Sequence, residues 1–274
     1  MIDMLQKITD SADFLKEKGF DNSAVGIVLG TGLGSFIDLI KIESSIPYDV
    51  IPNFPTATVE FHKGQLVTGS VSGVKVIAMQ GRFHYYEGYS MQQITFPVRV
   101  MKALGIKYLL LSNAAGGINP AFKKGDLVSI TDHINEQPEN PLRGLNDPAF
   151  GNRFTDMSRP YSDELNKKIT NAAKDLNVPL QTGIYVSVQG PNLETRAEYR
   201  HLRNMGADMV GMSTVPEVIV ANHIGLPCAA VSVITDECDP DNLMPVSIAD
   251  IIAVAEKSDA VLSKVFEKVI TDLA

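Results

Sequence analysis

The chain has 274 residues, with 24 Lys and Arg against 32 Asp and Glu, which gives a formal net charge of −8. Such an acidic chain lacks the basic surface that nucleic acids and anionic membranes attract, so we expect neither as a partner. Hydrophobic residues make up 45% and charged residues 20% of the sequence, which is typical of a globular protein with a sizeable core and excludes a disordered chain.

The two cysteines, Cys228 and Cys238, are too few for a disulfide framework, and their spacing does not match a zinc-binding pair. HExxH and paired CxxC motifs do not occur in the sequence, so we expect no metal. Residues 1–20 carry many charges and are typical of an amphipathic helix, not of a signal peptide. With no apolar run near the ~18 residues that span a membrane, we expect a cytoplasmic protein.

Apolar segments alternate with helical periodicity along most of the chain, which predicts an α/β fold with a largely buried sheet. Ser72-Gly73 is expected to turn a hairpin, which adds an antiparallel pair and makes the sheet mixed. The expected strands are 24–29, 65–71, 74–80, 107–113, 126–130, 182–188, 207–212 and 228–235, and the expected helices are 90–104, 162–176, 194–205, 215–224 and 247–272.

The least regular stretch is 132–160, which is rich in Pro, Asn, Asp and Arg and is predicted to be a long loop. A loop of this length inside a compact domain is usually functional or disordered. Its aromatic residues Phe150 and Phe154 indicate that it docks on another part of the protein or on a partner.

A glycine-rich turn, Gly30-Thr31-Gly32-Leu33-Gly34, follows the first apolar strand. Glycines let backbone amides approach a ligand, so this turn is either an anion cradle or a plain chain reversal. It matches neither GxGxxG, because Ser35 replaces the last glycine, nor a Walker loop. A dinucleotide site is therefore disfavoured.

Just after the strand 74–80, a span of five residues contains Arg82, His84 and Tyr86. Arg82 offers a planar fork suited to phosphate, His84 can donate to an anion or move a proton, and Tyr86 can contact a sugar. The alternative is an aromatic surface loop with a structural histidine. His62, which precedes a strand, is also a candidate, although a lone histidine is more often structural.

Four further strand ends carry small or polar residues. Small residues at 113–117 leave room for a ligand, or simply pack tightly. Glu194 can read a donor edge of a base, or it is an acid that favours the start of a helix. The segment 211–214 is not a GxSxG elbow, which argues against a serine hydrolase. The acidic run 236–241 is a cation site or a solvated loop, with Asp236 nearest the strand.

Nearly all of these signals lie just beyond the carboxyl end of an expected strand, where α/β folds bind ligands. Together they predict a cleft with anion-binding groups at one end and base-reading groups at the other.

The segments GRFHYYEGY, NAAGGIN, NPLRG, GPNLET and GADMVGMSTVPEVIVA occur in this order over most of the chain. Their combination resembles the trimeric, low-molecular-mass purine nucleoside phosphorylases. The resemblance implies a single α/β domain over residues 1–274, a mixed sheet distorted towards a barrel, and a homotrimer. It also implies phosphorolysis of purine nucleosides, with inorganic phosphate as co-substrate and no cofactor.

The resemblance also assigns roles to individual residues. Catalytic roles fall to His84, Glu194 and Asp236, and Phe150 is expected to reach into the site of a neighbouring subunit. Phosphate is implied to bind at Thr31, His62, Arg82, His84, Ala114 and Ser213. Nucleoside is implied to lie against Tyr86, Ala115, Gly116, Leu193, Glu194, Val210, Met212, Asp236 and Ile248.

Two positions depart from the commonest family pattern. Asp236 replaces an asparagine, and an ionised aspartate faces a 6-amino group better than a 6-oxo group. Glu194 argues the other way, because its carboxylate accepts from N1–H of hypoxanthine or guanine. Ile248 falls where many relatives place a histidine near the ribose 5′-hydroxyl, and an apolar residue there tolerates a 5′-methylthio group.

We therefore predict inosine and guanosine as the main substrates, with adenosine or methylthioadenosine as the alternative. A non-catalytic nucleoside-binding protein is a remote alternative, because the whole phosphate-binding set is present. A hydrolase is disfavoured for the same reason, since Arg82 and Ser213 would have little to bind.

Overall fold

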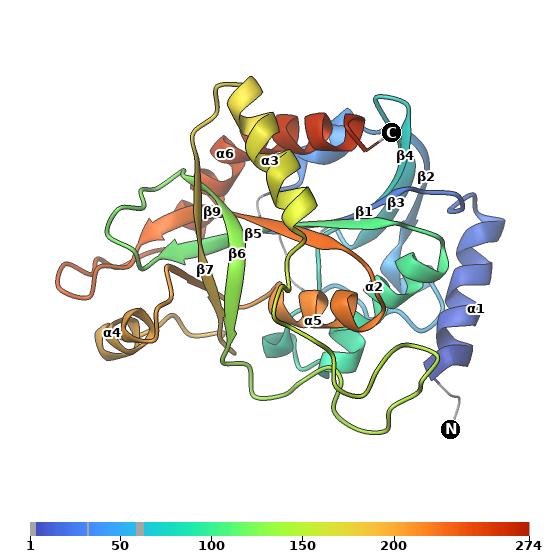
Figure 1. The fold of residues 1–274 in the computed structure, drawn as a ribbon, viewed down its shortest axis with the longest axis horizontal. Coiled ribbons are helices and arrows are strands. Elements are labelled where there is room, and N and C mark those ends of the chain that lie inside the picture. The colour runs from blue at the N-terminus through green and yellow to red at the C-terminus, as the bar shows by residue number, and fades with distance from the viewer. Residues whose placement is uncertain (1–3, 32, 59–62, 274) are drawn as a thin grey trace.

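The structure, a computed structural model, describes residues 4–31, 33–58 and 63–273. One mixed sheet runs through them in the order β2-β3-β4-β1-β5-β8-β7-β6-β9 (Figure 1). The strands are β1 (Val25–Leu29), β2 (Lys41–Pro47), β3 (Gln65–Val71), β4 (Val74–Gln80), β5 (Tyr108–Gly117), β6 (Leu127–Asn135), β7 (Leu180–Ser187), β8 (Met209–Gly211) and β9 (Cys228–Glu237).

Half of this sheet closes on itself. The long strand β5 pairs with β8 on one side and with β9 on the other, while β6 and β7 join β9 to β8. These pairings form a five-stranded ring, and β1 to β4 continue from β5 as an open sheet. The prediction of a mixed sheet distorted towards a barrel is confirmed.

Helices cover both faces of the sheet. The helices are α1 (Met4–Glu17), α2 (Met91–Ala103), α3 (Asp163–Asp175), α4 (Arg196–Asn204), α5 (Val215–His223) and α6 (Ile248–Thr271). On one side α1, α2 and α5 pack together, and on the other α3 packs on α6 (Figure 1). The protein has two large hydrophobic cores, and alternate residues of β5 contribute to them. Leu109 and Leu111 belong to one core and Leu110 to the other.

Every strand and helix expected from the sequence is present, with ends that differ by a few residues. The Ser72-Gly73 turn has φ values of 49° and 86°, as a two-residue hairpin loop requires. The strand β2 was not expected. It lies at the edge of the sheet, with most of its side chains exposed, so it lacks the apolar pattern that identifies a strand.

The predicted loop begins later than expected, because β6 continues to Asn135, and residues 136–162 contain no helix or strand. Phe150 packs against the core. The guanidinium carbon of Arg99 lies over the Phe150 ring, 4.9 Å from the ring centre. Phe154 is 90% exposed. The expectation that both aromatics dock is therefore correct within this chain for Phe150 alone.

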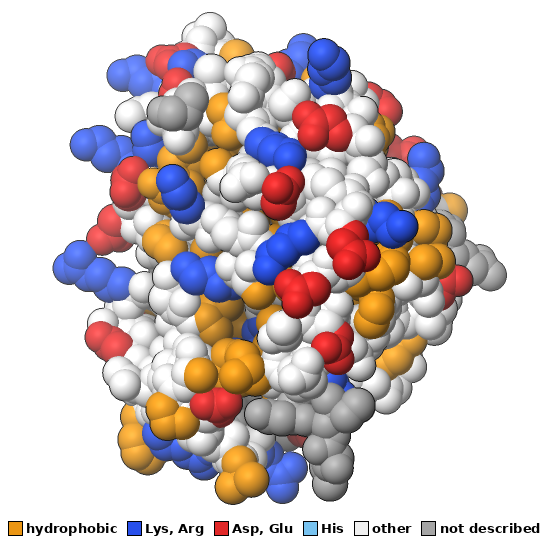
Figure 2. All heavy atoms as spheres, turned by 90° about the vertical axis from the view of Figure 1, so that its right-hand side faces the viewer, with side chains coloured by type: hydrophobic (Ala, Val, Ile, Leu, Met, Phe, Trp, Pro, Cys, Tyr) orange, Lys and Arg blue, Asp and Glu red, His pale blue; other side chains and the backbone are white. Residues whose placement is uncertain are grey.

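On the face that carries α1, acidic and basic side chains are interspersed (Figure 2). The lysines and arginines visible there do not gather into one basic patch, in keeping with the net charge of −8. Across the described residues, no helix is both long and apolar enough to cross a membrane.

Candidate active site

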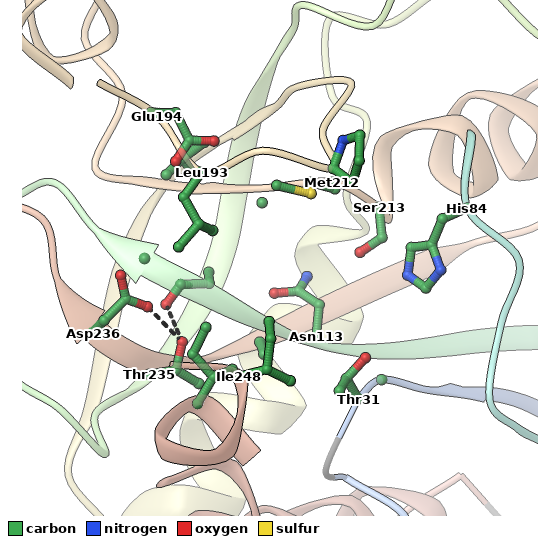
Figure 3. A pocket seen from close by; sticks show the side chains of 18 of the residues that line it. Thr31, His84, Asn113, Leu193, Glu194, Met212, Ser213, Thr235, Asp236 and Ile248 are labelled. Atoms are coloured by element: carbon green, nitrogen blue, oxygen red, sulfur yellow. Dashed lines mark hydrogen bonds between the residues drawn. The ribbon is translucent and has the colours of Figure 1, made fainter. Parts of the chain in front are cut away.

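A cavity of ≈ 320 Å³ lies where the carboxyl ends of several strands meet. The segments after β1, β4 and β7 contribute to it, together with the last residues of β5, β8 and β9. In Figure 3, Thr31, His84 and Ser213 lie at one end of the cavity, and Glu194 and Asp236 at the other. The two ends therefore differ in chemistry, as the sequence predicted.

The hydroxyl end is shaped by a strained turn. Thr214 has φ 70° and ψ −52°, and the Val215 N–H donates to the Ser213 carbonyl at 2.8 Å. This is a γ-turn with positive φ, which is rare outside glycine. It directs Ser213 into the cavity at the N-terminus of α5, where the helix dipole favours an anion.

Arg82 is 2% exposed and is held by the protein itself. Its Nη1 donates to the Thr214 hydroxyl at 2.9 Å, and its Nη2 donates to the carbonyls of Val28 (3.2 Å) and Ser112 (2.6 Å). The carboxylate of Glu217 lies 3.6 Å away. Arg82 is thus a fixed positive charge in the cavity wall, while its predicted hydrogen bonds to phosphate stay a prediction.

His84 is oriented by a carboxylate. Its ring Nδ1 lies 2.9 Å from Oε1 of Glu87, and its backbone N–H donates to the same oxygen at 2.7 Å. Burial raises the pKa of Glu87, but hydrogen bonds from His84 and the Thr58 hydroxyl outweigh it and leave the pKa below the usual value. An ionised Glu87 accepts from Nδ1–H of His84, so the ring proton is held on Nδ1 and Nε2 faces away from Glu87.

Tyr86 stacks on the His84 ring, with ring centres 4.7 Å apart and planes inclined by 12°. Burial and the neighbouring Glu87 raise the pKa of Tyr86 to about 12. The phenol therefore stays neutral and can donate a hydrogen bond to a sugar hydroxyl.

At the carboxylate end, Asp236 is 7% exposed and both of its oxygens accept hydrogen bonds. The Thr235 hydroxyl donates to Oδ1 at 2.8 Å and the Cys238 thiol to Oδ2 at 3.1 Å. Glu194 is the second carboxyl group, and burial, with Asp236 nearby, raises its pKa. The cavity thus presents two carboxyl groups at this end, a buried Asp236 and a half-buried Glu194.

At two glycines in the cavity wall, neighbouring side chains approach the backbone too closely to leave room for a Cβ atom. A Cβ on Gly116 would lie 2.5 Å from the Cys238 sulfur, and one on Gly211 would lie 2.3 Å from the Tyr185 hydroxyl. Because neither distance is possible for a real side chain, both positions must be glycine while their neighbours stay in place.

Residues 24–271 match the family model described as the phosphorylase superfamily. Over 267 residues the chain is 49% identical to purine nucleoside phosphorylase 1 of Bacillus subtilis, covering 97% of this chain and 98% of the relative. The chain belongs to the purine nucleoside phosphorylase family. It is also 47% identical to the Bos taurus purine nucleoside phosphorylase, covering 83% and 81% of the two chains.

Solved structures of the family share the fold. Isoform 2 of the Schistosoma mansoni purine nucleoside phosphorylase, in complex with cytosine and ribose-1-phosphate, superposes with a TM-score of 0.93 at 41% identity, covering 98% and 97% of the chains. A Schistosoma mansoni purine nucleoside phosphorylase in complex with adenosine superposes with 0.92 at 39% identity, covering 98% of each chain.

Most of the residues that the family resemblance singled out come together in this cavity. Its lining includes Thr31, Arg82, His84, Tyr86, Ala114, Ala115, Gly116, Leu193, Glu194, Val210, Met212, Ser213, Asp236 and Ile248. His62 lies outside the described residues. Phe150 does not line the cavity of its own chain, and its predicted role towards a neighbouring subunit stays a prediction.

Further lining residues were not predicted. Gly30, Asn113, Pro191 and Gly211 lie inside the quoted motifs without an assigned role, whereas Tyr199, Thr235 and Ile251 were not considered. Thr235 could have been found as the neighbour of Asp236, and Ile251 lies about one helical turn after Ile248. Tyr199 carries no comparable signal, because an aromatic residue early in a helix usually packs in a core.

Proposed function

We propose that this protein catalyses the reversible phosphorolysis of purine nucleosides, which yields a free purine base and ribose or deoxyribose 1-phosphate. The observation that carries the proposal is a single cavity with hydroxyl and cationic groups at one end and two carboxyl groups at the other. Membership of the purine nucleoside phosphorylase family supports it.

In this reaction a phosphate oxygen attacks the anomeric carbon as its bond to the purine nitrogen breaks. The sugar becomes cationic in the transition state, and the bound phosphate dianion stabilises it. The charge of Arg82, the start of α5 and Ser213 suit the phosphate, and Nε2 of His84, whose proton is held on Nδ1, is suited to accept from the O–H of a hydrogen phosphate. The purine leaves with negative charge, which a proton or hydrogen bond at N7 must neutralise.

No metal or organic cofactor is needed for these steps, because inorganic phosphate is itself the nucleophile. A fixed guanidinium and backbone dipoles supply the charge that a metal would otherwise provide. The two free, buried cysteines suit a reducing compartment such as the cytoplasm.

Inosine and guanosine are the main substrates of this proposal, since an ionised Glu194 accepts from N1–H of a 6-oxopurine. Adenosine and methylthioadenosine are the alternative, favoured by Asp236 and by the apolar Ile248 at the cavity. Related structures have been solved with adenosine and with hypoxanthine, so both kinds of purine fit cavities of this family.

The decisive experiment measures base release from inosine, guanosine, adenosine and methylthioadenosine, each with and without phosphate. Phosphate-dependent release from inosine and guanosine is the expected result. Release that does not depend on phosphate would indicate a hydrolase, and binding without release would indicate a nucleoside-binding protein. Either result would contradict the proposal.

We also propose a homotrimer, in which Phe150 of one subunit completes the site of the next. Gel filtration with light scattering measures the assembly directly. A monomer with full activity would contradict a shared site.

A further inference from the structure

A buried aspartate of α6 holds the segment that follows β1. We call this segment, residues 30–34, the β1 turn; its residue 32 lies outside the described residues. The backbone N–H of Ser35, directly after the β1 turn, donates to Oδ2 of Asp259 at 2.6 Å. Asp259 is 3% exposed, and the Ser263 hydroxyl, one helical turn further along α6, donates to its Oδ1 at 3.2 Å. Both oxygens of this carboxyl group therefore accept a hydrogen bond inside the protein.

The other end of the β1 turn is held by β5. The Gly30 N–H donates to the Ser112 hydroxyl at 3.2 Å, and the Leu33 N–H donates back to the Gly30 carbonyl at 3.1 Å. A Cβ on Gly30 would lie 2.8 Å from the Ser112 carbonyl oxygen, so the backbone packs directly on β5. Thr31 lies between the two attachments and lines the hydroxyl end of the cavity (Figure 3).

The helix α6 provides a firm support for the far end of the β1 turn. The short 3-10 helix Ser35–Leu39 packs on α6, where the rings of Phe36 and Phe266 meet edge to face with centres 6.4 Å apart. The first turn of α6 reaches the cavity through Ile248 and Ile251. Asp259 lies eight residues after Ile251, about 12 Å along the helix, and is not among the residues that line the cavity.

Stability alone does not account for a carboxyl group at position 259. Among the residues that the structure describes, no lysine or arginine forms an ion pair with Asp259. Burial raises the pKa of Asp259, and the hydrogen bonds from Ser35 and Ser263 offset only part of this effect. A buried acid without a basic partner costs folding free energy that a small apolar residue would not cost. What the carboxyl group adds is its contact with the end of the β1 turn.

We propose that Asp259 is a positioning residue that fixes the β1 turn on α6, so that Thr31 is held where phosphate binds. This inference rests on the proposed function, in which phosphate occupies the hydroxyl end of the cavity. A displacement of about 1 Å caused by a change far from the reacting atoms can cost as much as 10²-fold in activity. Without Asp259 the β1 turn stays attached to β5 through Gly30, so we expect a smaller loss that is confined to phosphate.

The test measures KM for phosphate and KM for inosine separately, each with the other substrate saturating. Asp259→Ala removes the acceptor of the Ser35 N–H, so KM for phosphate should rise about tenfold while KM for inosine stays within about twofold. Asp259→Asn keeps an oxygen acceptor at the same place, so its KM for phosphate should stay within about threefold of the wild type. A purely structural role would lower the amount of folded protein and leave the ratio of the two KM values unchanged.

A neighbouring serine of α6 provides the matched control. Ser258 is also buried, and its hydroxyl donates to the Gly125 carbonyl at 3.2 Å, away from the β1 turn. Ser258→Ala therefore removes a hydrogen bond of the same helix and should leave KM for phosphate unchanged. Thermal unfolding with and without inorganic phosphate gives an independent measure of binding. The rise in unfolding temperature caused by phosphate should be smaller in Asp259→Ala than in the wild type or in Ser258→Ala.

The outcomes separate this inference from the proposed function. An unchanged KM for phosphate in a folded Asp259→Ala would overturn the positioning role and leave the phosphorylase intact. Equal rises in KM for phosphate and for inosine would also overturn it, because they would indicate a general disturbance of the cavity. No phosphate-dependent base release by the wild type would overturn both. If Asp259→Ala does not fold, Asp259→Leu, which has a similar size and no acceptor, decides the question by the same two KM values.

Discussion

One carboxylate oxygen of Glu87 meets His84 twice, at 2.9 Å from the ring Nδ1 and 2.7 Å from the backbone nitrogen. The imidazole therefore cannot turn without breaking the Nδ1 contact, and the backbone contact keeps the Glu87 carboxylate in place. His84 caps the short 3-10 helix Tyr85–Glu87, and Glu87 is the last residue of that helix, so the local chain and the side chain together hold the histidine. Because the Thr58 hydroxyl donates to Glu87, the pair also connects the hydroxyl end of the cavity to the loop before β3.

Replacing Glu87 by glutamine should lower kcat/KM for phosphorolysis about tenfold, mainly through a higher KM for phosphate. The neutral amide loses a charge-assisted hydrogen bond to His84, so the ring proton and its orientation are less well fixed. Steady-state kinetics with varied phosphate measures the effect. The exposed Glu256→Gln on α6 serves as the control, and an unchanged KM for phosphate in Glu87→Gln would contradict this role.

The same carboxylate makes stability depend on pH in a defined direction. The pKa of Glu87 is lower in the folded protein than its usual value, so its contribution to stability is fully present above the unfolded value of ~4.3 and declines as pH falls through the folded pKa. Urea unfolding at pH 7 and pH 4 should show a larger difference between wild type and Glu87→Gln at pH 7. An equal difference at both pH values would contradict it.

Thr214 supports two buried donors at the strained turn. Its hydroxyl accepts from Nη1 of Arg82 at 2.9 Å and from Nδ2 of Asn113 at 2.8 Å. Thr214→Ala removes the acceptor that these two donors share and should lower the free energy of unfolding by about 2–3 kcal/mol. Thr214→Ser keeps the hydroxyl and should cost less than about 1 kcal/mol. Urea unfolding checks both, with the exposed Thr170→Ala as control. Equal losses in the alanine and serine variants would contradict the role of the hydroxyl.

The sequence predicted the location of the site well, because strand ends are recognisable and the carboxyl ends of strands gather in one place. Arg82, His84 and Glu194 were found this way. The hydrogen-bond partners of these residues were not predicted. Arg82 donates to the backbone carbonyls of Val28 and Ser112, and a backbone carbonyl on a distant strand cannot be recognised as a partner from the sequence.

Two other features were hidden for different physical reasons. The γ-turn at Thr214 is an unusual conformation for a threonine, and its cost is offset by packing that only the folded chain provides. The acidic run 236–241, which contains Cys238, was interpreted as a cation site or a solvated loop, because its residues are mostly charged. In the fold Cys238 is buried beside Asp236 and Tyr199. Burial set by tertiary contacts cannot be read from local composition.

Ile248 tests the preference for the 5′ substituent. It is the first residue of α6, half-exposed at the cavity. Ile248→His introduces a polar ring that favours a hydroxyl and disfavours a methylthio group, so kcat/KM for methylthioadenosine relative to adenosine should fall about tenfold. Val261→His, on the same helix outside this cavity, is the control. An unchanged ratio would show that position 248 does not contact the 5′ group.

Asp236 offers the most direct test of how the base is read. In Asp236→Asn the amide nitrogen can donate to a 6-oxo group and the amide oxygen can accept from N7–H, whereas a 6-amino group would meet a second donor. The ratio of kcat/KM for inosine to that for adenosine should therefore rise at least about tenfold. Asp241→Asn is the matched control, since that carboxylate is exposed and pairs with Arg200 at 2.6 Å. If Asp236→Asn lowers both activities equally, the residue holds the cavity together without reading the purine edge. If the ratio moves as expected, the difference between 6-oxo and 6-amino purines is set at this carboxyl group.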